Sequence, residues 1–426
     1  MDIVLLFVML FGMIAFGVPV AIALTGSSAI FILANGTPPP VVVAHRMING
    51  VDSFPLLAVP FFILAGNLMN TSGITARIFS FALALVGWMR GGLGHVNIGA
   101  SVIFAGMSGA AVADAGGLGA IEIKAMRDAN YPPGFAVGVT AASSTIGPII
   151  PPSLPMVIYG VVAGASIGQL FAAGFVPGLM MAAALMLMVA WYARREGYPA
   201  DQPFHLPTLW TAFRRAFLSL LTPAIIVGGI LSGAFTPTEA AVAACAWALV
   251  LGLLVYRTLT WKRFVRVSFD TIETTAVVLF VVGAASIFAW LLTSNRVPEH
   301  FAATLLSISD RPWVILLLMN LILLIVGCFM ETIAAITILV PVLLPVAVTL
   351  GIDPVHFGVI MVLNLMIGLL TPPVGMVLYV LARVAKMPFE ECVVATAPFL
   401  IPLGVVLLLI TFIPGLTLWL PTLIYR

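Results

Sequence analysis

The sequence predicts an all-α protein that crosses a membrane many times, and three observations support this prediction. Of its 426 residues, 62% are hydrophobic and only 8% are charged, whereas soluble domains have about 45–50% apolar and about 25% charged residues. Apolar runs of membrane-spanning character recur along the whole chain. The third observation is that the second half of the sequence repeats the first.

The apolar runs are continuous. They include Leu179–Trp191, Ala240–Tyr256, Ala276–Leu292, Val314–Val326 and Pro398–Ile413. Only helices and closed barrels satisfy their backbone polar groups in lipid, and barrel strands alternate apolar with polar residues. Because these runs do not alternate, they predict a helical bundle.

Charge and residue spacing exclude several classes of function. The net charge of +2 is too small to indicate a nucleic-acid partner. The three cysteines and five histidines lack the spacing of a metal site or a disulfide framework. No phosphate-binding glycine loop and no nucleophile–base pair is present, so we expect neither an ATPase, nor another enzyme, nor a cofactor.

An internal repeat divides the chain. Residues 106–152 align with residues 327–373 without a gap. The matched identities include Gly106 with Gly327, Gly147 with Gly368, Pro151 with Pro372, and Pro152 with Pro373. We therefore expect a first repeat over 1–192, a cytoplasmic linker over 193–215 and a second repeat over 216–426.

The distribution of Lys and Arg predicts the orientation of the repeats. Each half is expected to cross five times: two short helices split at Pro19 or Pro237, a third helix, a broken helix and a final helix. With the N-terminus outside, 14 of the 18 basic residues lie in the cytoplasm, in agreement with the positive-inside rule. An odd number of crossings inverts the second half, as in many secondary transporters. One long kinked helix over residues 3–34 is an alternative that would change this topology.

Two small-residue segments, Phe104–Asp114 and Val326–Ala334, interrupt apolar sequence at matched positions. Each is predicted to form the tip of a re-entrant hairpin. Tight helix packing through small residues would explain the Gly and Ala residues but not the acids Asp114 and Glu331, since an ionisable group at membrane depth costs at least about 2.5 kcal/mol. A separate charged group, which we expect at the cytoplasmic surface, comprises Glu122, Lys124, Arg127 and Asp128.

A second pair of interruptions is Ser143–Pro152 and Asn364–Pro373, each containing a Gly and ending in Pro-Pro. Proline removes a backbone donor and breaks a helix, and broken backbone at membrane depth must be buried in protein or line a wet cavity. Freed carbonyls suit a hard cation, and the N-terminus of the next half-helix suits an anion. The alternative is a pair of kinks that only shape the bundle. The residues expected to contact a substrate are Ser108, Asp114, Pro151, Pro152, Pro372 and Pro373.

In order along nearly the whole chain, these motifs resemble the large membrane (M) subunit of TRAP (tripartite ATP-independent periplasmic) transporters. The motifs are Phe104–Gly109, Ala113-Asp114, Gly147–Ser153, Phe175–Gly178, Phe235–Ala241 and Gly368–Gly375. The resemblance implies an elevator-type secondary transporter fold related to sodium–dicarboxylate symporters. Its moving core would span about 94–165 and 312–385, and the rest would form a scaffold. The chain departs from the family pattern at Ala110, Glu331 and Met376-Val377.

The resemblance also implies a function and a set of ligands. The chain would import an organic acid across the bacterial inner membrane by sodium symport, together with a small four-helix membrane subunit and a periplasmic substrate-binding protein. The implied sodium ligands of one site are Ser108, Gly109, Ser144, Thr145 and Gly147. Those of the other site are Gly327, Glu331, Thr332, Asn364, Gly368 and Thr371.

Three alternative functions remain open at this point. A stand-alone sodium–dicarboxylate symporter would share the topology but need no binding protein. An ion channel is disfavoured because two inverted halves favour alternating access over an open pore, and an intramembrane enzyme is disfavoured by the lack of a catalytic pair. The sequence does not identify the organic acid.

Overall fold

The protein is helical throughout the part that the structure describes. The computed structural model describes all residues except 1–2, 37, 199, 202, 310 and 426, and for 106–108 it describes the backbone alone. The described residues form no strand, and their one isolated β-bridge joins Arg90 to Ala200. Eight described helices are long and apolar enough to cross a membrane. The prediction of an all-α polytopic protein is therefore confirmed.

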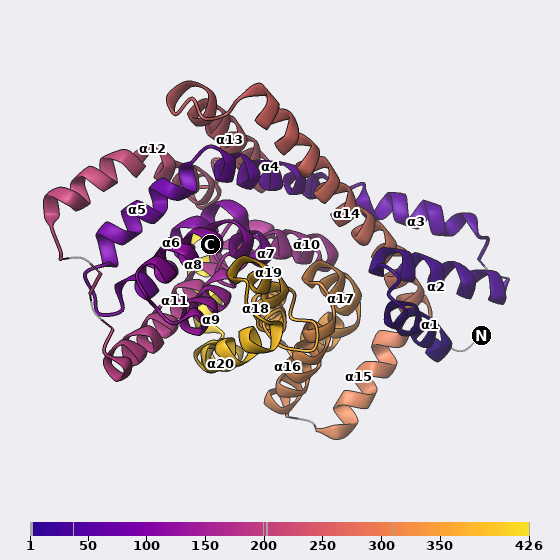
Figure 1. The fold of residues 1–426 in the computed structure, drawn as a ribbon. Helices are drawn as coiled ribbons and strands as arrows, with labels where there is room; N and C mark the ends of the chain where they lie inside the picture. The colour runs from indigo at the N-terminus through magenta and orange to yellow at the C-terminus, as the bar shows by residue number, and fades with distance from the viewer. Residues whose placement is uncertain (1–2, 37, 199, 202, 310, 426) are drawn as a thin grey trace.

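The helices follow one another with short connections (Figure 1). In the first half they are α1 (Ile3–Ala15), α2 (Val20–Asn35), α3 (Val41–Val51), η1 (Phe54–Leu57), α4 (Ala58–Thr71), α5 (Ile74–Val86), α6 (Gly92–Ser108), α7 (Ala111–Gly116), α8 (Leu118–Asp128), α9 (Pro133–Ser144), α10 (Leu154–Ala163) and α11 (Ile167–Glu196). In the second half they are α12 (Leu206–Leu231), α13 (Pro237–Val250), η2 (Leu251–Val255), α14 (Trp261–Ser294), α15 (Val297–Ile308), α16 (Pro312–Phe329), α17 (Thr332–Thr349), α18 (Pro354–Gly368), α19 (Met376–Ala385), α20 (Phe389–Phe412) and α21 (Gly415–Ile424).

The N-terminal residues form two helices and not one long kinked helix. The chain turns at Gly17, whose φ of 81° lies in the left-handed region that glycine adopts without strain. Helices α1 and α2 then pack against each other. The matched split in the second half precedes Pro237, where Thr236 and Glu239 form a capping box at the start of α13. The chain is thus divided at both prolines where the sequence predicted a split.

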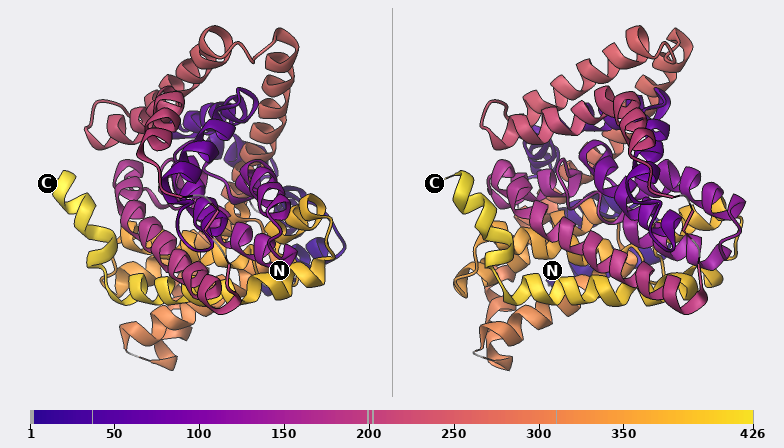
Figure 2. Two further views of the ribbon diagram at one scale, coloured as in Figure 1. Left: turned by 60° about the vertical axis from the view of Figure 1, so that its left-hand side comes forward. Right: turned by 90° about the vertical axis from the view of Figure 1, so that its left-hand side faces the viewer.

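The two halves interlock in the centre of the molecule. Helix α9 packs on α20, α10 on α17, and α7 on α19, so that each contact joins one half to the other. Figure 1 shows α6 to α10 gathered with α16 to α20 in one central group. Outside this group α14, 34 residues long, packs against α2, α3 and α4 on one side and against α17 on another. Figure 2 shows α12, α13 and the start of α14 as an outer layer at one end of the molecule.

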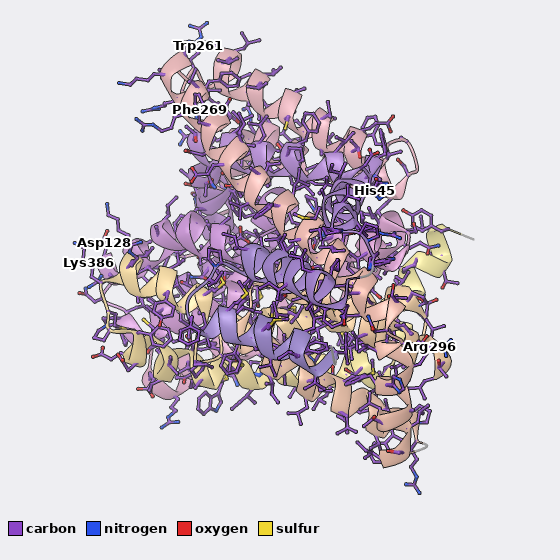
Figure 3. The ribbon with its side chains drawn as sticks, turned by 90° about the vertical axis from the view of Figure 1, so that its right-hand side faces the viewer. His45, Asp128, Trp261, Phe269, Arg296 and Lys386 are labelled. Atoms are coloured by element: carbon purple, nitrogen blue, oxygen red, sulfur yellow. The ribbon has the colours of Figure 1, made fainter. Side chains whose placement is uncertain are left out.

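Charged residues lie at opposite ends of the molecule. Figure 3 shows Asp128 and Lys386 close together at one end and Arg296 at the other. The sequence placed Lys386 in the cytoplasm and Arg296 outside. These two residues therefore lie at separate ends of the fold, and the sidedness itself stays a prediction.

Candidate functional site

The first hairpin tip touches the first helix break, and we call this contact the first junction (residues 109–114 with 144–154). Gly109 has a φ of 61°, and its carbonyl accepts a hydrogen bond from Leu154 N–H at 3.3 Å. A Cβ at residue 109 would lie 2.6 Å from the carbonyl oxygen of Pro152. Only glycine combines this φ with so close an approach. The tip is thereby held against the chain that follows the cis Pro151–Pro152 bond.

Hydroxyl groups crowd the break between α9 and α10. Ser144 and Thr145 donate to the carbonyls of Ala141 and Ala142, at 2.8 and 2.6 Å. The Ser143 hydroxyl instead donates to Asn97 Oδ1 on α6, at 2.6 Å. All three hydroxyl side chains are buried. Each hydroxyl oxygen keeps lone pairs that suit a cation.

Asp114 belongs to the first junction. It lies in the short helix α7, is only 2% exposed, and its carboxylate approaches Gly147 so closely that a Cβ at residue 147 would overlap Oδ2. The structure thus brings Asp114 and Gly147 together, as expected for one site. Ser108, also predicted in this site, has a side chain outside the described residues.

The second junction (residues 327–332 with 364–374) has the same plan. The Cys328 carbonyl accepts a hydrogen bond from Val374 N–H at 3.2 Å, just after the cis Pro372–Pro373 bond. Gly327 and Gly368 are the point of closest approach between α16 and α18, since a Cβ at residue 368 would lie 2.6 Å from the Gly327 backbone. Small residues permit such contacts between membrane helices.

Two of the buried polar atoms without a hydrogen-bond partner in the described chain belong to the second junction. Thr332 Oγ1 and Asn364 Oδ1 are buried, and neither atom forms a hydrogen bond with the described residues. The amide nitrogen of Asn364 donates to Asn320, to Oδ1 at 2.7 Å and to the carbonyl at 3.1 Å. A buried oxygen without a partner is costly, and a hard cation would satisfy it. Thr371 donates to the Ile367 carbonyl at 2.8 Å.

Glu331 acts as the N-cap of α17. Its Oε2 accepts hydrogen bonds from Ile333 N–H at 2.9 Å and from Ala334 N–H at 3.1 Å. These bonds satisfy amides that the helix start leaves free, and a carboxylate there is favoured by the helix dipole. This gives Glu331 a local structural role that sequence reasoning had not assigned.

Glu122 was missed by sequence reasoning. It was grouped with surface charges, but it is only 1% exposed, and its Oε1 has no partner in the described part of the chain. Its neighbours one turn away on either side, Leu118 and Met126, are also buried. That i, i+4 spacing is the sequence signal that could have placed Glu122 on the inward face of α8.

A polar clamp holds the first hairpin at its other end. The Asp201 carboxylate accepts from Leu93 N–H at 2.6 Å and from the Tyr131 hydroxyl at 2.8 Å. Burial, and then the nearby Asp201 charge, raise the pKa of Tyr131, so that its hydroxyl stays a donor at neutral pH. The segment between the two halves is thereby tied to the start of α6.

No group of three or more His, Cys, Asp or Glu side chains in the described chain could hold a transition metal. The two junctions instead offer hydroxyl, amide and carbonyl oxygens beside broken helices. Oxygen groups beside broken helices, at matched positions of a helical bundle, are typical of the class of membrane transport proteins.

Comparison with known proteins identifies the family. Residues 7–416 match the family described as the DctM component of tripartite ATP-independent periplasmic transporters. The chain therefore belongs to this family. It is a transport protein and not an enzyme, a multi-pass protein of the inner membrane, and a member of a family that works with a periplasmic binding protein and a small membrane subunit.

Several relatives are similar over most of the chain. The sialic acid TRAP transporter large permease protein SiaM of Vibrio cholerae is 50% identical over 97% of this chain and 96% of that protein. SiaT of Haemophilus influenzae, a sialic acid TRAP transporter permease, is 45% identical over 89% of this chain and 62% of that longer protein. The C4-dicarboxylate large permease DctM of Rhodobacter capsulatus is 36% identical over the full length of both.

A solved structure shares the fold. The YdaH transporter of Alcanivorax borkumensis superposes with a TM-score of 0.61 over 88% of each chain, at 15% sequence identity. At this identity the likeness concerns the fold alone.

Proposed function

We propose that this chain uses two sodium ions to import a small organic acid, which a periplasmic binding protein delivers and a small membrane subunit helps to receive. The observation that carries the proposal is the matched construction of the two junctions. In each, a carbonyl of the hairpin tip accepts a hydrogen bond from a backbone N–H one or two residues beyond a Pro-Pro pair, from Leu154 at the first junction and from Val374 at the second. Each junction would bind one sodium ion, and the substrate would lie between them.

The ligands of each ion come from the residues around the break. At the first junction they are Ser108, Gly109, Ser144, Thr145 and Gly147, and at the second they are Gly327, Glu331, Thr332, Asn364, Gly368 and Thr371. The strongest support is at the second junction, where Thr332 Oγ1 and Asn364 Oδ1 are buried without a partner. Oxygen ligands of this kind suit a hard monovalent cation.

The carboxylate of the substrate would bind where α10 and α19 begin, directly after the two breaks. The positive end of the helix dipole favours an anion there. The contact residues proposed are Ser108, Asp114, Pro151, Pro152, Pro372 and Pro373. Because an ionised Asp114 would repel a carboxylate, Asp114 would contact the substrate as the protonated acid, which can donate a hydrogen bond.

Transport would move a core of residues 94–165 and 312–385 against the remaining helices, in an elevator motion of two inverted repeats. Two sodium ions with one monovalent acid carry one net positive charge inward. A potential of about 100 mV then contributes about 2.3 kcal/mol, and two tenfold sodium gradients contribute about 2.8 kcal/mol. The total of about 5 kcal/mol supports accumulation on the order of 10³-fold to 10⁴-fold.

Sialic acid is the first substrate to test, because the relatives at 50% and 45% identity are named as sialic acid transporters. The chain would be reconstituted in liposomes with its small subunit and binding protein, and uptake of labelled sialic acid and of C4-dicarboxylates would be measured. Uptake that needs an inward sodium gradient and the binding protein supports the proposal. Undiminished uptake with a proton gradient alone would refute sodium coupling. Strong uptake by this chain alone would favour the stand-alone symporter.

A further inference from the structure

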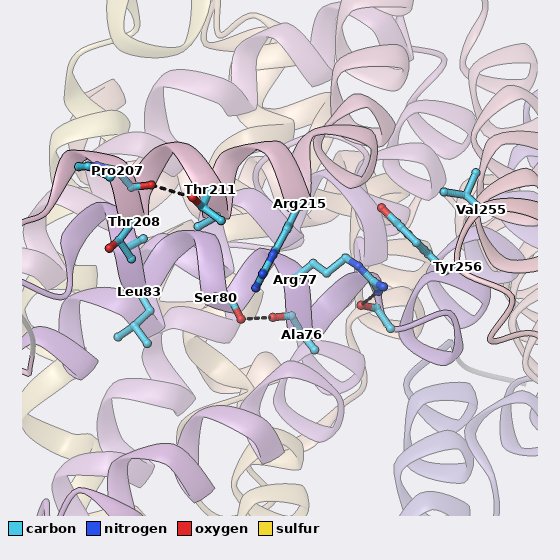
Figure 4. Close-up of a pocket in the computed structure, with 13 residues that line it drawn as sticks. Ala76, Arg77, Ser80, Leu83, Pro207, Thr208, Thr211, Arg215, Val255 and Tyr256 are labelled. Atoms are coloured by element: carbon cyan, nitrogen blue, oxygen red, sulfur yellow. Dashed lines mark hydrogen bonds between the residues drawn. The ribbon is translucent and has the colours of Figure 1, made fainter.

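A large cavity lies between α5 and α12, away from both junctions. It has a volume of about 1140 Å³, and Val255 and Tyr256 are among the residues that line it. Its walls come mainly from α5 and from the first half of α12 (Figure 4). Apolar side chains and short hydroxyl side chains share the lining: Ala76, Ser80, Leu83, Ala84, Pro207, Thr208, Thr211 and Ala212.

Arg77 is fixed in this cavity by two contacts. Its Nη1 donates to the Gly73 carbonyl at 2.8 Å, and its guanidinium carbon lies 3.7 Å from the ring centroid of Tyr256. The Tyr256 hydroxyl is in turn 2.9 Å from the Ser219 hydroxyl. A guanidinium held by one carbonyl and one ring keeps further N–H donors for a ligand.

Arg215 faces Arg77 from the other wall. Figure 4 shows Arg215 reaching from α12 toward the side where Arg77 and Ser80 lie. The one ion pair among the described residues joins Arg195 to Glu196, so neither cavity arginine has a carboxylate partner there. Two like charges directed into one cavity repel each other, and an anion between them relieves this repulsion.

We propose that this cavity binds an anionic phospholipid, with the phosphate between Arg77 and Arg215 and an acyl chain along Leu83 and Ala84. Guanidinium groups match phosphate oxygens in pairs. The cavity is far larger than a phosphate ion, and its apolar walls give an acyl chain a place that a free anion would not use. Both arginines also belong to the basic set predicted on the cytoplasmic side, where anionic lipids attract such residues.

The lipid would contact the helices that hold the first hairpin. Both α5 and α12 pack directly on α6, the first helix of that hairpin. A bound lipid therefore bridges two helices of the outer layer at the point where they support α6. Because the lipid would bind only the folded chain, we expect it to stabilise that folded chain.

The test uses the purified, delipidated full-length chain and native mass spectrometry. Dioleoyl phosphatidylglycerol is titrated, with dioleoyl phosphatidylcholine as the zwitterionic comparison. In the double variant Arg77→Gln/Arg215→Gln, phosphatidylglycerol affinity should fall about 30-fold, since the two guanidinium groups on either side of the phosphate, worth about 1 kcal/mol each, are removed. The charge-matched control Arg194→Gln/Lys262→Gln changes two exposed residues outside the cavity and should leave the affinity unchanged.

A second variant separates cavity filling from loss of charge. Thr211→Trp keeps both arginines but occupies the cavity, and it should also weaken phosphatidylglycerol binding. Equal loss in the control pair, or no loss in either cavity variant, would overturn the proposal. Displacement of the lipid by millimolar inorganic phosphate would assign the site to a small anion instead. Protection of a cysteine at position 211 by the small subunit, in lipid-free detergent, would assign the cavity to a protein partner and would also overturn it.

Discussion

The two junctions have the same local construction but different surroundings. In both, a tip carbonyl accepts a hydrogen bond from a backbone N–H one or two residues beyond a Pro-Pro pair. Yet Pro151 and Pro152 are buried at the first junction, whereas Pro372 and Pro373 are exposed at the second. Matched sequence thus gives matched backbone, and the difference arises from what packs around it.

Helix α11 covers the first junction through two glycines. A Cβ at Gly174 would overlap the Ile149 carbonyl, and a Cβ at Gly178 would overlap the Ile150 side chain. At the second junction, the nearby side chains Phe329 and Tyr379 are more than half exposed. If the two junctions are the two ion sites, the first is covered by the chain itself and the second is not.

The closest contact of the second junction gives the largest expected effect. Gly368→Ala places a Cβ 2.6 Å from the Gly327 backbone, so α16 and α18 must separate. We expect destabilisation of about 1–3 kcal/mol and loss of most transport, measured by thermal unfolding in detergent and by uptake. Gly404→Ala is the control, because a Cβ there meets nothing within 4 Å. Equal effects of the two variants would show that the contact has no special role.

Thiol labelling tests the difference in exposure directly. In a background without Cys245, Cys328 and Cys392, Tyr379→Cys should react with a water-soluble maleimide on the order of 100-fold faster than Val157→Cys, because the buried site needs local opening. Tyr379 is 51% exposed and Val157 is fully buried. Both lie just after the breaks, at nearly matched positions of the repeat. Similar labelling rates would remove the asymmetry between the junctions.

The hydroxyl of Thr332 offers a sharp test of ion binding, since it makes no hydrogen bond within the described chain. Thr332→Val should raise the sodium concentration for half-maximal uptake by about tenfold, which corresponds to about 1.4 kcal/mol, with little change in folding. Thr337→Val is the matched control in the same helix, because its hydroxyl bonds only to the carbonyls of Ile333 and Ala334. An unchanged sodium requirement in Thr332→Val would reject this residue as a ligand.

The clamp at Asp201 gives the smallest expected effect, and it concerns the first hairpin alone. Asp201→Asn weakens the charge-assisted bonds from Leu93 and Tyr131, and we expect a loss of about 1 kcal/mol in stability. Tyr131→Phe removes one of the same bonds, so the double variant should lose less than the sum of the single losses. Additive losses, measured by chemical unfolding, would show that the two residues act separately.

The breaks and tips could be predicted because their cause is local. Pro151-Pro152 and Pro372-Pro373 lack amide donors, so α9 and α18 end before them wherever the chain is placed. The split at Pro19 also followed from sequence pattern, whereas the meeting of the first tip with the first break was expected only from the family resemblance. These features depend on a few neighbouring residues and on the repeat.

Other features depend on packing between distant segments and were not predicted. The burial of Glu122 follows from the packing of α8 on α6 and α9, and the cover over the first break follows from α11. The segment 193–215, expected to be a linker, already contains the start of α12 at Leu206. The capping role of Glu331 could not be predicted, because it depends on the exact residue at which α17 begins, and helix ends are uncertain by one or two residues.

Counting bound sodium ions tests the central claim most directly. The purified chain, in detergent without substrate, would be titrated with radioactive sodium, and the number of ions bound per chain would be measured by scintillation proximity. Two matched junctions predict about two saturable ions in the native chain, and in Thr332→Val one of the two should bind about tenfold more weakly, since one buried oxygen ligand is removed. No saturable sodium binding, or a stoichiometry and affinity unchanged in Thr332→Val, would contradict the account.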